Sequence, residues 1–170
     1  MQLFDFGLAK ELKKRDLVKG CTDKYHATGL TGSRRYMAPE VVESEPYGFG
    51  ADVYSFGILL WEMVALRTPF CGYDANKHYE QVVLAAQRPT LVRSWPLALR
   101  TLLPQCWATS AADRLDILAV CQSLQSQLQD AELNSGGGEE ELHISTRSRY
   151  LSSRQAVLEE DQQQKIFDSN

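Results

Sequence analysis

The chain has 170 residues, of which 44% are hydrophobic and 24% are charged, and its formal net charge is -4 at pH 7. This length and apolar content are ordinary for a single globular domain. Residues 1–128 hold 14 Lys and Arg against 13 Asp and Glu, a net charge of +1, which excludes the basic excess typical of a general nucleic-acid binder. We therefore expect no nucleic-acid partner.

The first half of the chain predicts one mobile loop and two helices. Residues 1–4 are typical of the end of a short apolar strand that leads into Asp5. Residues 8–31 are polar, basic and interrupted by glycine, which favours a mobile loop. Pro39 suits a first helical turn, so a short helix is expected within 37–42. Residues 51–66 carry apolar side chains on all sides, which predicts a buried central helix, and this run is too short for a membrane span.

The second half predicts three more helices and a tail. Asp74 is a good N-cap for a helix that continues to about residue 86. The next helix is expected over 94–107, where Pro104 should kink or shorten it. A last helix is expected over 112–129. Residues 131–170 are rich in Ser, Gln and acidic residues, which predicts a disordered tail after a domain of residues 1–130.

The cysteines and histidines do not predict a metal site. The four cysteines contain no Cys-x-x-Cys pair and the three histidines have no mutual spacing, so we expect reduced thiols and surface histidines. The N-terminus has no apolar segment typical of a signal peptide, so we expect a cytoplasmic protein with no membrane partner.

Three motifs in fixed order carry the functional information: Asp5-Phe6-Gly7, Gly32-Ser33-Arg34-Arg35-Tyr36-Met37-Ala38-Pro39-Glu40, and Asp52-Val53-Tyr54-Ser55-Phe56-Gly57. With the basic loop between the first two, this set resembles a eukaryotic protein kinase catalytic domain from its metal-binding Asp onward. The run from Asp52 to Glu62 and the Cys106-Trp107 pair are most similar to the tyrosine-kinase-like group, whose members mostly phosphorylate serine and threonine. The resemblance implies a mainly α fold, the distal part of the C-terminal lobe, with helices packed around the 51–66 helix.

The resemblance also implies roles for single residues. Asp5 would bind the magnesium ion that bridges the phosphates of ATP. Residues 8–28 would form an activation loop, with Thr28 or Thr31 as the phosphoacceptor, although an unregulated solvated loop is the alternative. Ser33 would be the hydroxyl of the substrate-docking loop.

Three further residues would hold the lobe together. Glu40 and Arg114 would form a buried bidentate ion pair. Asp52 would be buried and short of hydrogen-bond partners, because the catalytic loop that donates to it in the family is not in this sequence. Trp107 is expected to be a core aromatic. The sequence departs from the family pattern at Ala111-Ala112-Asp113, at Leu115 and at Pro104.

Only four residues precede Asp5, so this sequence contains no Gly-rich loop, no strand Lys and no His-Arg-Asp motif. We therefore expect a serine/threonine kinase by family, with ATP, magnesium and protein substrates in the intact kinase, but no cofactor and no activity for this chain alone. The central helix should then present part of its apolar surface to water. The alternative is a noncatalytic kinase-like module that binds protein partners.

Overall fold

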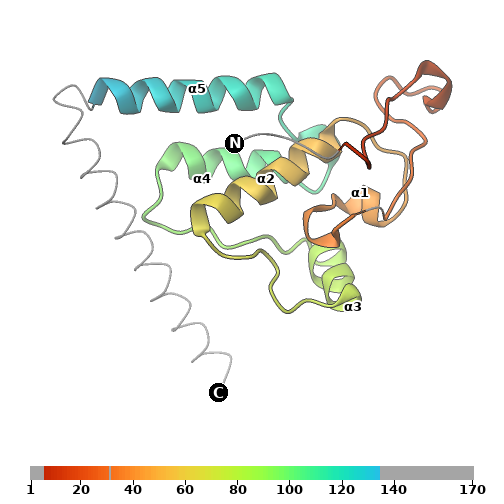
Figure 1. Cartoon of the computed structure of the whole chain (residues 1–170), viewed down its shortest axis with the longest axis horizontal. Coiled ribbons are helices and arrows are strands. Elements are labelled where there is room, and N and C mark those ends of the chain that lie inside the picture. Colours follow the sequence, from red (N-terminus) through yellow and green to blue (C-terminus); the bar gives the residue numbers. More distant parts are fainter. Residues whose placement is uncertain (1–5, 31, 135–170) are drawn as a thin grey trace.

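The computed structural model of the chain describes residues 6–30 and 32–134. In the described part all regular elements are helical, and the expected mainly α fold is confirmed (Figure 1). The α-helices are α1 Pro39–Val42, α2 Gly50–Ala65, α3 Ala75–His78, α4 Leu97–Cys106 and α5 Ile117–Asn134. Shorter elements are the 3-10 turns η1 Lys14–Asp16, η2 Arg34–Tyr36 and η4 Ala111–Asp113, and the π-helix η3 Tyr79–Leu84.

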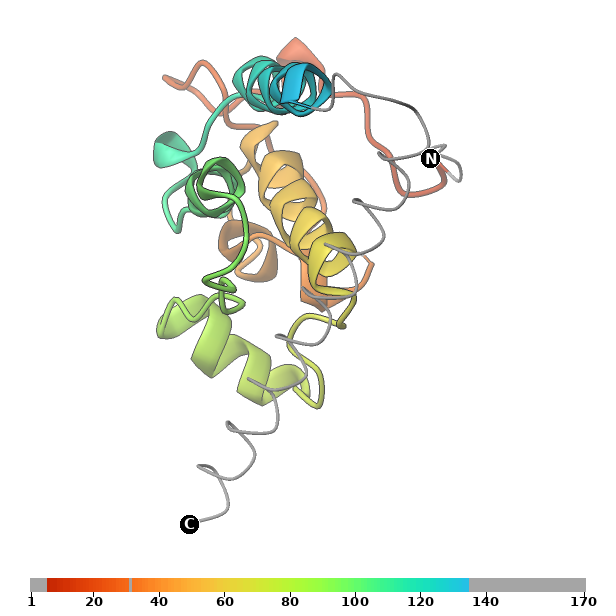
Figure 2. The same ribbon diagram turned by 90° about the vertical axis from the view of Figure 1, so that its left-hand side faces the viewer.

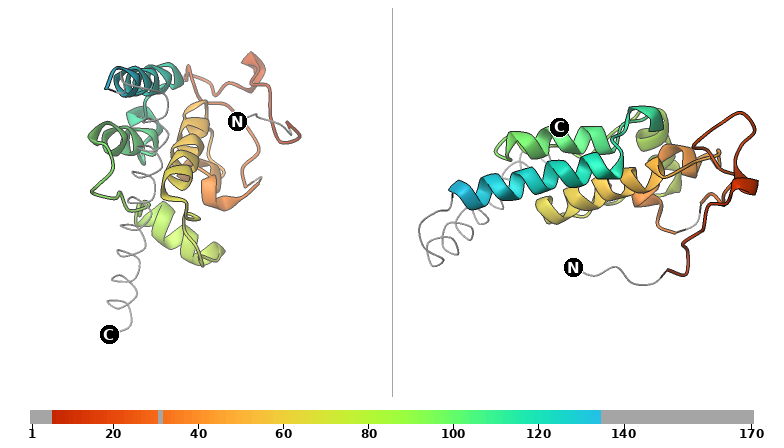
Figure 3. Two further views of the ribbon diagram at one scale, coloured as in Figure 1. Left: turned by 60° about the vertical axis from the view of Figure 1, so that its left-hand side comes forward. Right: turned by 90° about the horizontal axis from the view of Figure 1, so that it is seen from above.

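Helix α2 is the central element, as expected. It packs beside α4, and α5 lies above these two helices and packs against α4 (Figure 2). Seen from above, the axes of these three helices run in similar directions (Figure 3). The close approach of α2 and α4 depends on Gly57, because a Cβ atom built there would lie 2.7 Å from the Cβ of Cys106.

The hydrophobic core lies between α2, α4 and the segment that leads into α4. The rings of Trp61 and Trp95 meet edge to face, with centroids 6.5 Å apart, and Trp107 belongs to the same cluster. The indole N–H of Trp61 donates to the carbonyl of Thr90 at 2.9 Å, which satisfies the one polar atom that this ring brings into the core. Trp107 is therefore a core residue, as the sequence predicted.

The helix predicted to start at Asp74 is present. The Asp74 carboxylate accepts from the backbone N–H of Lys77 at 2.8 Å, as an N-cap does. The helix changes after His78 into the wider turns of η3, where the N–H of Ala85 donates to the carbonyl of Glu80, five residues earlier. This element ends at Leu84, slightly before the predicted end.

The last two helices differ from the prediction in their bounds. Pro104 lies inside α4, which continues to Cys106. The final helix begins at Ile117 instead of 112, because Arg114 has an extended backbone (φ −80°, ψ 146°) and Asp116 caps the new start by accepting from the N–H of Ala119. It extends to Asn134, beyond the predicted end at 129.

The long loop before η2 is tied to the rest of the fold by backbone pairing. Tyr25 pairs with Leu17 on one side and with Tyr47 on the other, in two antiparallel bridges. Gly48 allows this contact, because a Cβ atom at that position would lie 2.0 Å from the carbonyl oxygen of Asp23. The loop thus packs on the segment between α1 and α2.

One stripe of α2 is only partly covered by the described residues. Asp52 and Met63 are exposed and Phe56 and Leu59 are half-buried, at the spacing of one helix face. This agrees with the expected exposure of part of the central helix. The structure gives no membrane-spanning candidate among the helices of residues 6–30 and 32–134. The predicted strand at 1–4 and most of the predicted tail at 131–170 lie outside the described residues.

Candidate functional site

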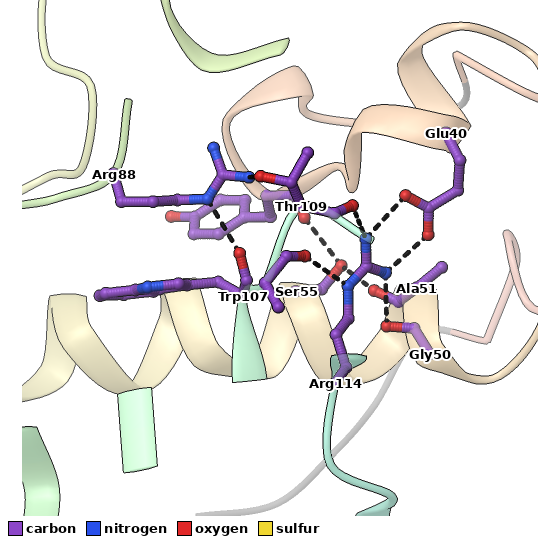
Figure 4. A network of polar contacts seen from close by, with 10 residues as sticks. Glu40, Gly50, Ala51, Ser55, Arg88, Trp107, Thr109 and Arg114 are labelled. Atoms are coloured by element: carbon purple, nitrogen blue, oxygen red, sulfur yellow. Dashed lines mark hydrogen bonds and ion pairs between the residues drawn. The ribbon is translucent and has the colours of Figure 1, made fainter. Parts of the chain in front are cut away.

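The polar centre of the described chain is an ion pair between Glu40, on α1, and Arg114, which follows η4 (Figure 4). Arg114 Nη1 donates to Glu40 Oε1 at 2.6 Å, and Nη2 donates to Oε2 at 2.8 Å. The two residues are 74 positions apart in the sequence. The bidentate contact that the family resemblance implied is therefore present in the structure.

All five N–H donors of Arg114 are used. Besides the carboxylate, its guanidinium donates to the carbonyls of Ala108 (2.9 Å), Gly50 (2.9 Å) and Thr109 (3.1 Å). The Arg114 side chain has no exposed surface, and that of Glu40 is 13% exposed. The extended backbone at Arg114 places the side chain at the start of α2, so this one residue joins α1, α2 and the α4–α5 connection.

A second arginine, Arg88, also lies over the ring of Tyr54. The guanidinium carbons of Arg88 and Arg114 each lie 5.1 Å from the centroid of the fully buried Tyr54 ring. Arg88 also donates to the carbonyls of Trp107 and Val82, both at 2.9 Å. Sequence reasoning missed Arg88, since a single Arg after a helix has no distinguishing pattern.

The η2 turn is fixed on α2 through Tyr36. The Tyr36 hydroxyl donates to Glu62 Oε2 at 2.5 Å, and its backbone carbonyl accepts from the hydroxyl of Ser55 at 2.8 Å. Burial raises the pKa of Tyr36 and the Glu62 carboxylate raises it further, whereas Arg35 lowers it. The hydroxyl therefore stays protonated and keeps its bond. Ser33, at the start of this turn, is exposed.

The remaining predicted site residues do not gather at one point in the described structure. Thr28 is exposed, and its carbonyl accepts from the hydroxyl of Tyr47 at 2.9 Å. Asp5 and Thr31 lie outside the described residues. Asp52 is exposed, so the expectation that it is buried was wrong. It sits on the partly covered stripe of α2 rather than on the face that packs against α4.

His78 was expected at the surface, and this was also wrong. Its side chain belongs to a residue only 4% exposed, and its ring packs edge to face on Phe70 with centroids 5.6 Å apart. Burial lowers the pKa of His78, and Arg34, Arg35 and Arg88 lower it further. The sequence did contain a signal: His78 precedes the buried Val82 by four residues, so the two share one helix face.

The described residues contain no cluster of metal-ligating side chains and no disulfide. In residues 6–30 and 32–134 no three His, Cys, Asp or Glu side chains gather in a way that could hold a metal ion. All four cysteines are free thiols, and burial raises the pKa of Cys106 to about 11, so that its thiol stays protonated at neutral pH.

Comparisons with known proteins agree with the family that the motifs indicate. The sequence model described as protein tyrosine and serine/threonine kinase matches residues 1–124. Serine/threonine-protein kinase VIK from Arabidopsis thaliana is 36% identical over 74% of this chain and 28% of its own length. Serine/threonine/tyrosine-protein kinase HT1 from the same plant is 34% identical over 67% of this chain and 30% of its own. Mitogen-activated protein kinase kinase kinase 7 from Bos taurus is 35% identical over 61% of this chain and 18% of its own.

The chain thus spans less than a third of the length of each of these three relatives. The match itself covers most of the chain, from the first residue through the first turns of α5. The chain belongs to the protein tyrosine and serine/threonine kinase family.

Proposed function

We propose that residues 1–130 are the distal part of a protein serine/threonine kinase catalytic domain, followed by a polar tail over residues 131–170. The reaction is transfer of the γ-phosphoryl group of ATP to serine and threonine hydroxyls of protein substrates. The observation that carries this proposal is the buried pair of Glu40 and Arg114, which joins the segment after the docking loop to the late helices. The family match supports the activity, and the similarity to a serine/threonine-protein kinase supports the acceptor type.

In this proposal three positions act in the intact kinase. Asp5 holds magnesium, which in this chemistry neutralises the charge that develops on the transferred phosphoryl group. Ser33 supplies the hydroxyl of the docking loop, and its exposed position at the start of η2 suits contact with a substrate. Thr28 or Thr31 accepts a regulatory phosphate. The cation-rich loop, with Lys10, Lys13 and Lys14 among its members, would then pair with that phosphate.

The 170 residues alone are proposed to be inactive. Phosphoryl transfer by protein kinases depends on a Gly-rich loop, a strand Lys, a catalytic Asp and Asn, and the metal-binding Asp. This sequence offers a candidate only for the last of these, Asp5. A single carboxylate cannot position a nucleotide that the family binds through several groups.

The genomic sequence upstream of the Met1 codon tests the proposal first. An in-frame His-Arg-Asp-x-x-x-x-Asn motif about 20 residues before Asp5 would support a kinase. A stop codon directly upstream would favour the alternative, a noncatalytic module that binds protein partners.

The protein encoded by the extended reading frame is then incubated with MgATP and a mixture of protein substrates, and the labelled amino acids are identified. We expect phosphoserine and phosphothreonine, with the signal lost in Asp5→Asn. Asp23→Asn is the matched control, because Asp23 is an exposed loop carboxylate and should retain activity. Labelling on tyrosine alone, or equal activity of Asp5→Asn and wild type, would refute the proposed function.

A further inference from the structure

A small pocket lies between the docking loop and the segment that leads into α3. It has a volume of about 150 Å³, and Ser33, Arg34 and Arg35 line one side, whereas Phe70, Asp74 and His78 line the other. It is separate from the network around Glu40 and Arg114. The proposed function uses Ser33 as a docking-loop hydroxyl, but it gives no role to the other residues that line this pocket.

Two of its polar groups are buried without a hydrogen-bond partner. In the described part of the chain, neither ring nitrogen of His78 has a partner, although the residue is only 4% exposed. The Nε of Arg35 is likewise buried and unpartnered. Buried polar groups in folded proteins are nearly always hydrogen-bonded, so this pocket indicates a bound group that can accept from the Nε–H of Arg35 and from the one N–H of the neutral His78 ring.

The charges of the pocket specify the kind of group. Arg34 and Arg35 contribute two positive charges, and Asp74 contributes one negative charge. The Asp74 carboxylate is already engaged, because its Oδ1 accepts from the N–H of Lys77 at 2.8 Å. Arg88 adds to the positive field at His78, but its donors are committed to backbone carbonyls and to Thr109. The unpartnered N–H groups of Arg35 and His78 therefore lie in a region of net positive charge, which favours the binding of an anion.

We propose that this pocket binds a carboxylate or phosphoryl group on a side chain of the protein substrate. The inference rests on the proposed kinase function, since it takes the Ser33–Tyr36 turn as part of the substrate-docking loop. That turn is held rigidly on α2 through Tyr36, so an anion held by Arg34 and Arg35 would fix the substrate backbone beside Ser33. The substrate class is thus acidic or previously phosphorylated protein segments.

The binding test uses the 170-residue chain and three peptide libraries. Each peptide has a serine acceptor with random residues around it, except for one flanking position that is Glu in the first library, phosphoserine in the second and Gln in the third. This fixed position is moved in turn through all positions that flank the acceptor. The ring signals of His78 are followed by nuclear magnetic resonance during titration. We expect the Glu and phosphoserine libraries to move these signals at one position of the scan and the Gln library to leave them unchanged.

Variants of the two arginines connect binding with the pocket. Arg34→Gln and Arg35→Gln should each weaken the binding of the Glu and phosphoserine libraries about tenfold or more, as expected for loss of a charge-assisted hydrogen bond. Arg93→Gln is the matched control, an exposed arginine that does not line the pocket, and should bind like wild type. Arg34 is exposed, so its substitution should not disturb folding even if that of Arg35 does.

Several results would overturn the inference. Equal binding of the Glu and Gln libraries, or unchanged affinity of Arg34→Gln and Arg35→Gln for the Glu library, would show that the pocket does not select for an anion. Inorganic phosphate bound as tightly as the best peptide would make it a site for a free anion. Displacement of the His78 signals by phosphate on Thr28, without peptide, would assign the pocket to the chain's own loop.

The same libraries given to the extended protein separate this inference from the proposed function. Phosphorylation with a preference for Glu or phosphoserine, and a raised KM with unchanged kcat in Arg34→Gln, would support both. Phosphorylation without any such preference would refute the inference and leave the kinase function standing. Binding of acidic peptides without any phosphoryl transfer would refute the kinase function and leave an anion-binding docking pocket.

Discussion

Replacing Arg114 by methionine should destabilise the chain more than any surface change. The side chain has no exposed surface, and its removal leaves the Glu40 carboxylate, only 13% exposed, without its counter-charge. Breaking a buried ion pair in this way costs about 3–5 kcal/mol. The carbonyls of Gly50, Ala108 and Thr109 lose a donor as well, which places the effect in the upper part of that range. For a domain with a total stability of about 5–15 kcal/mol, this is a large fraction.

Urea unfolding of the 170-residue chain, followed by tryptophan fluorescence, measures this loss, because Trp61, Trp95 and Trp107 all lie in the core. At about 3–4 °C per kcal/mol, the melting temperature should fall by about 10–20 °C. Glu11→Gln is the control, because its ion pair with Lys13 spans 3.1 Å between side chains 80% and 47% exposed. Loss of such a surface pair should cost less than about 1 kcal/mol.

A double-mutant cycle with Glu40→Gln isolates the interaction from other effects. The double variant should lose at least about 1 kcal/mol less than the sum of the single losses, since neither charge is then left unpaired. Additive losses, or a loss below about 1 kcal/mol in Arg114→Met, would refute the view that this pair holds the lobe together.

Three further predictions address packing, pH and regulation. Gly57→Ala should destabilise the chain by about 1–3 kcal/mol, the usual cost of overpacking, because the new Cβ would lie 2.7 Å from that of Cys106. An unchanged urea midpoint would contradict this. The pKa of His78 is lowered in the folded state, so its contribution to stability is present above the unfolded pKa near 6.5 and is lost as the pH falls below that value. In His78→Phe the free energy of unfolding should therefore depend less on pH below about 6.5. In the intact kinase, Ala at both Thr28 and Thr31 should lower activity, and equal activity with an unchanged loop proteolysis pattern would count against regulation there.

The long-range part of the structure was predictable where motif residues fix a contact. The pairing of Glu40 with Arg114 followed from family pattern, and the burial of α2 followed from apolar residues on all its sides. The N-cap at Asp74 was predictable because its carboxylate needs only local backbone geometry.

Other features depend on tertiary context that the sequence does not display. The last helix starts at Ile117 because the backbone of Arg114 must remain extended for its side chain to reach Glu40. The helix propensity of residues 112–116 contains no information about this long-range contact. The burial of His78 depends on Phe70 folding back over it. Asp52 was predicted to be buried by analogy with family members, in which a catalytic loop covers this position. That loop is not in this sequence, and Asp52 is exposed in the described structure.

Thermal unfolding with and without MgATP tests the central claim most directly, on the 170-residue chain and on the product of the extended reading frame. A nucleotide at 100 times its dissociation constant stabilises a protein by about 2.7 kcal/mol. We predict such a shift for the extended protein, reduced in Asp5→Ala, and no shift for residues 1–170. Stabilisation of the 170-residue chain by MgATP that disappears in Asp5→Ala would contradict the account.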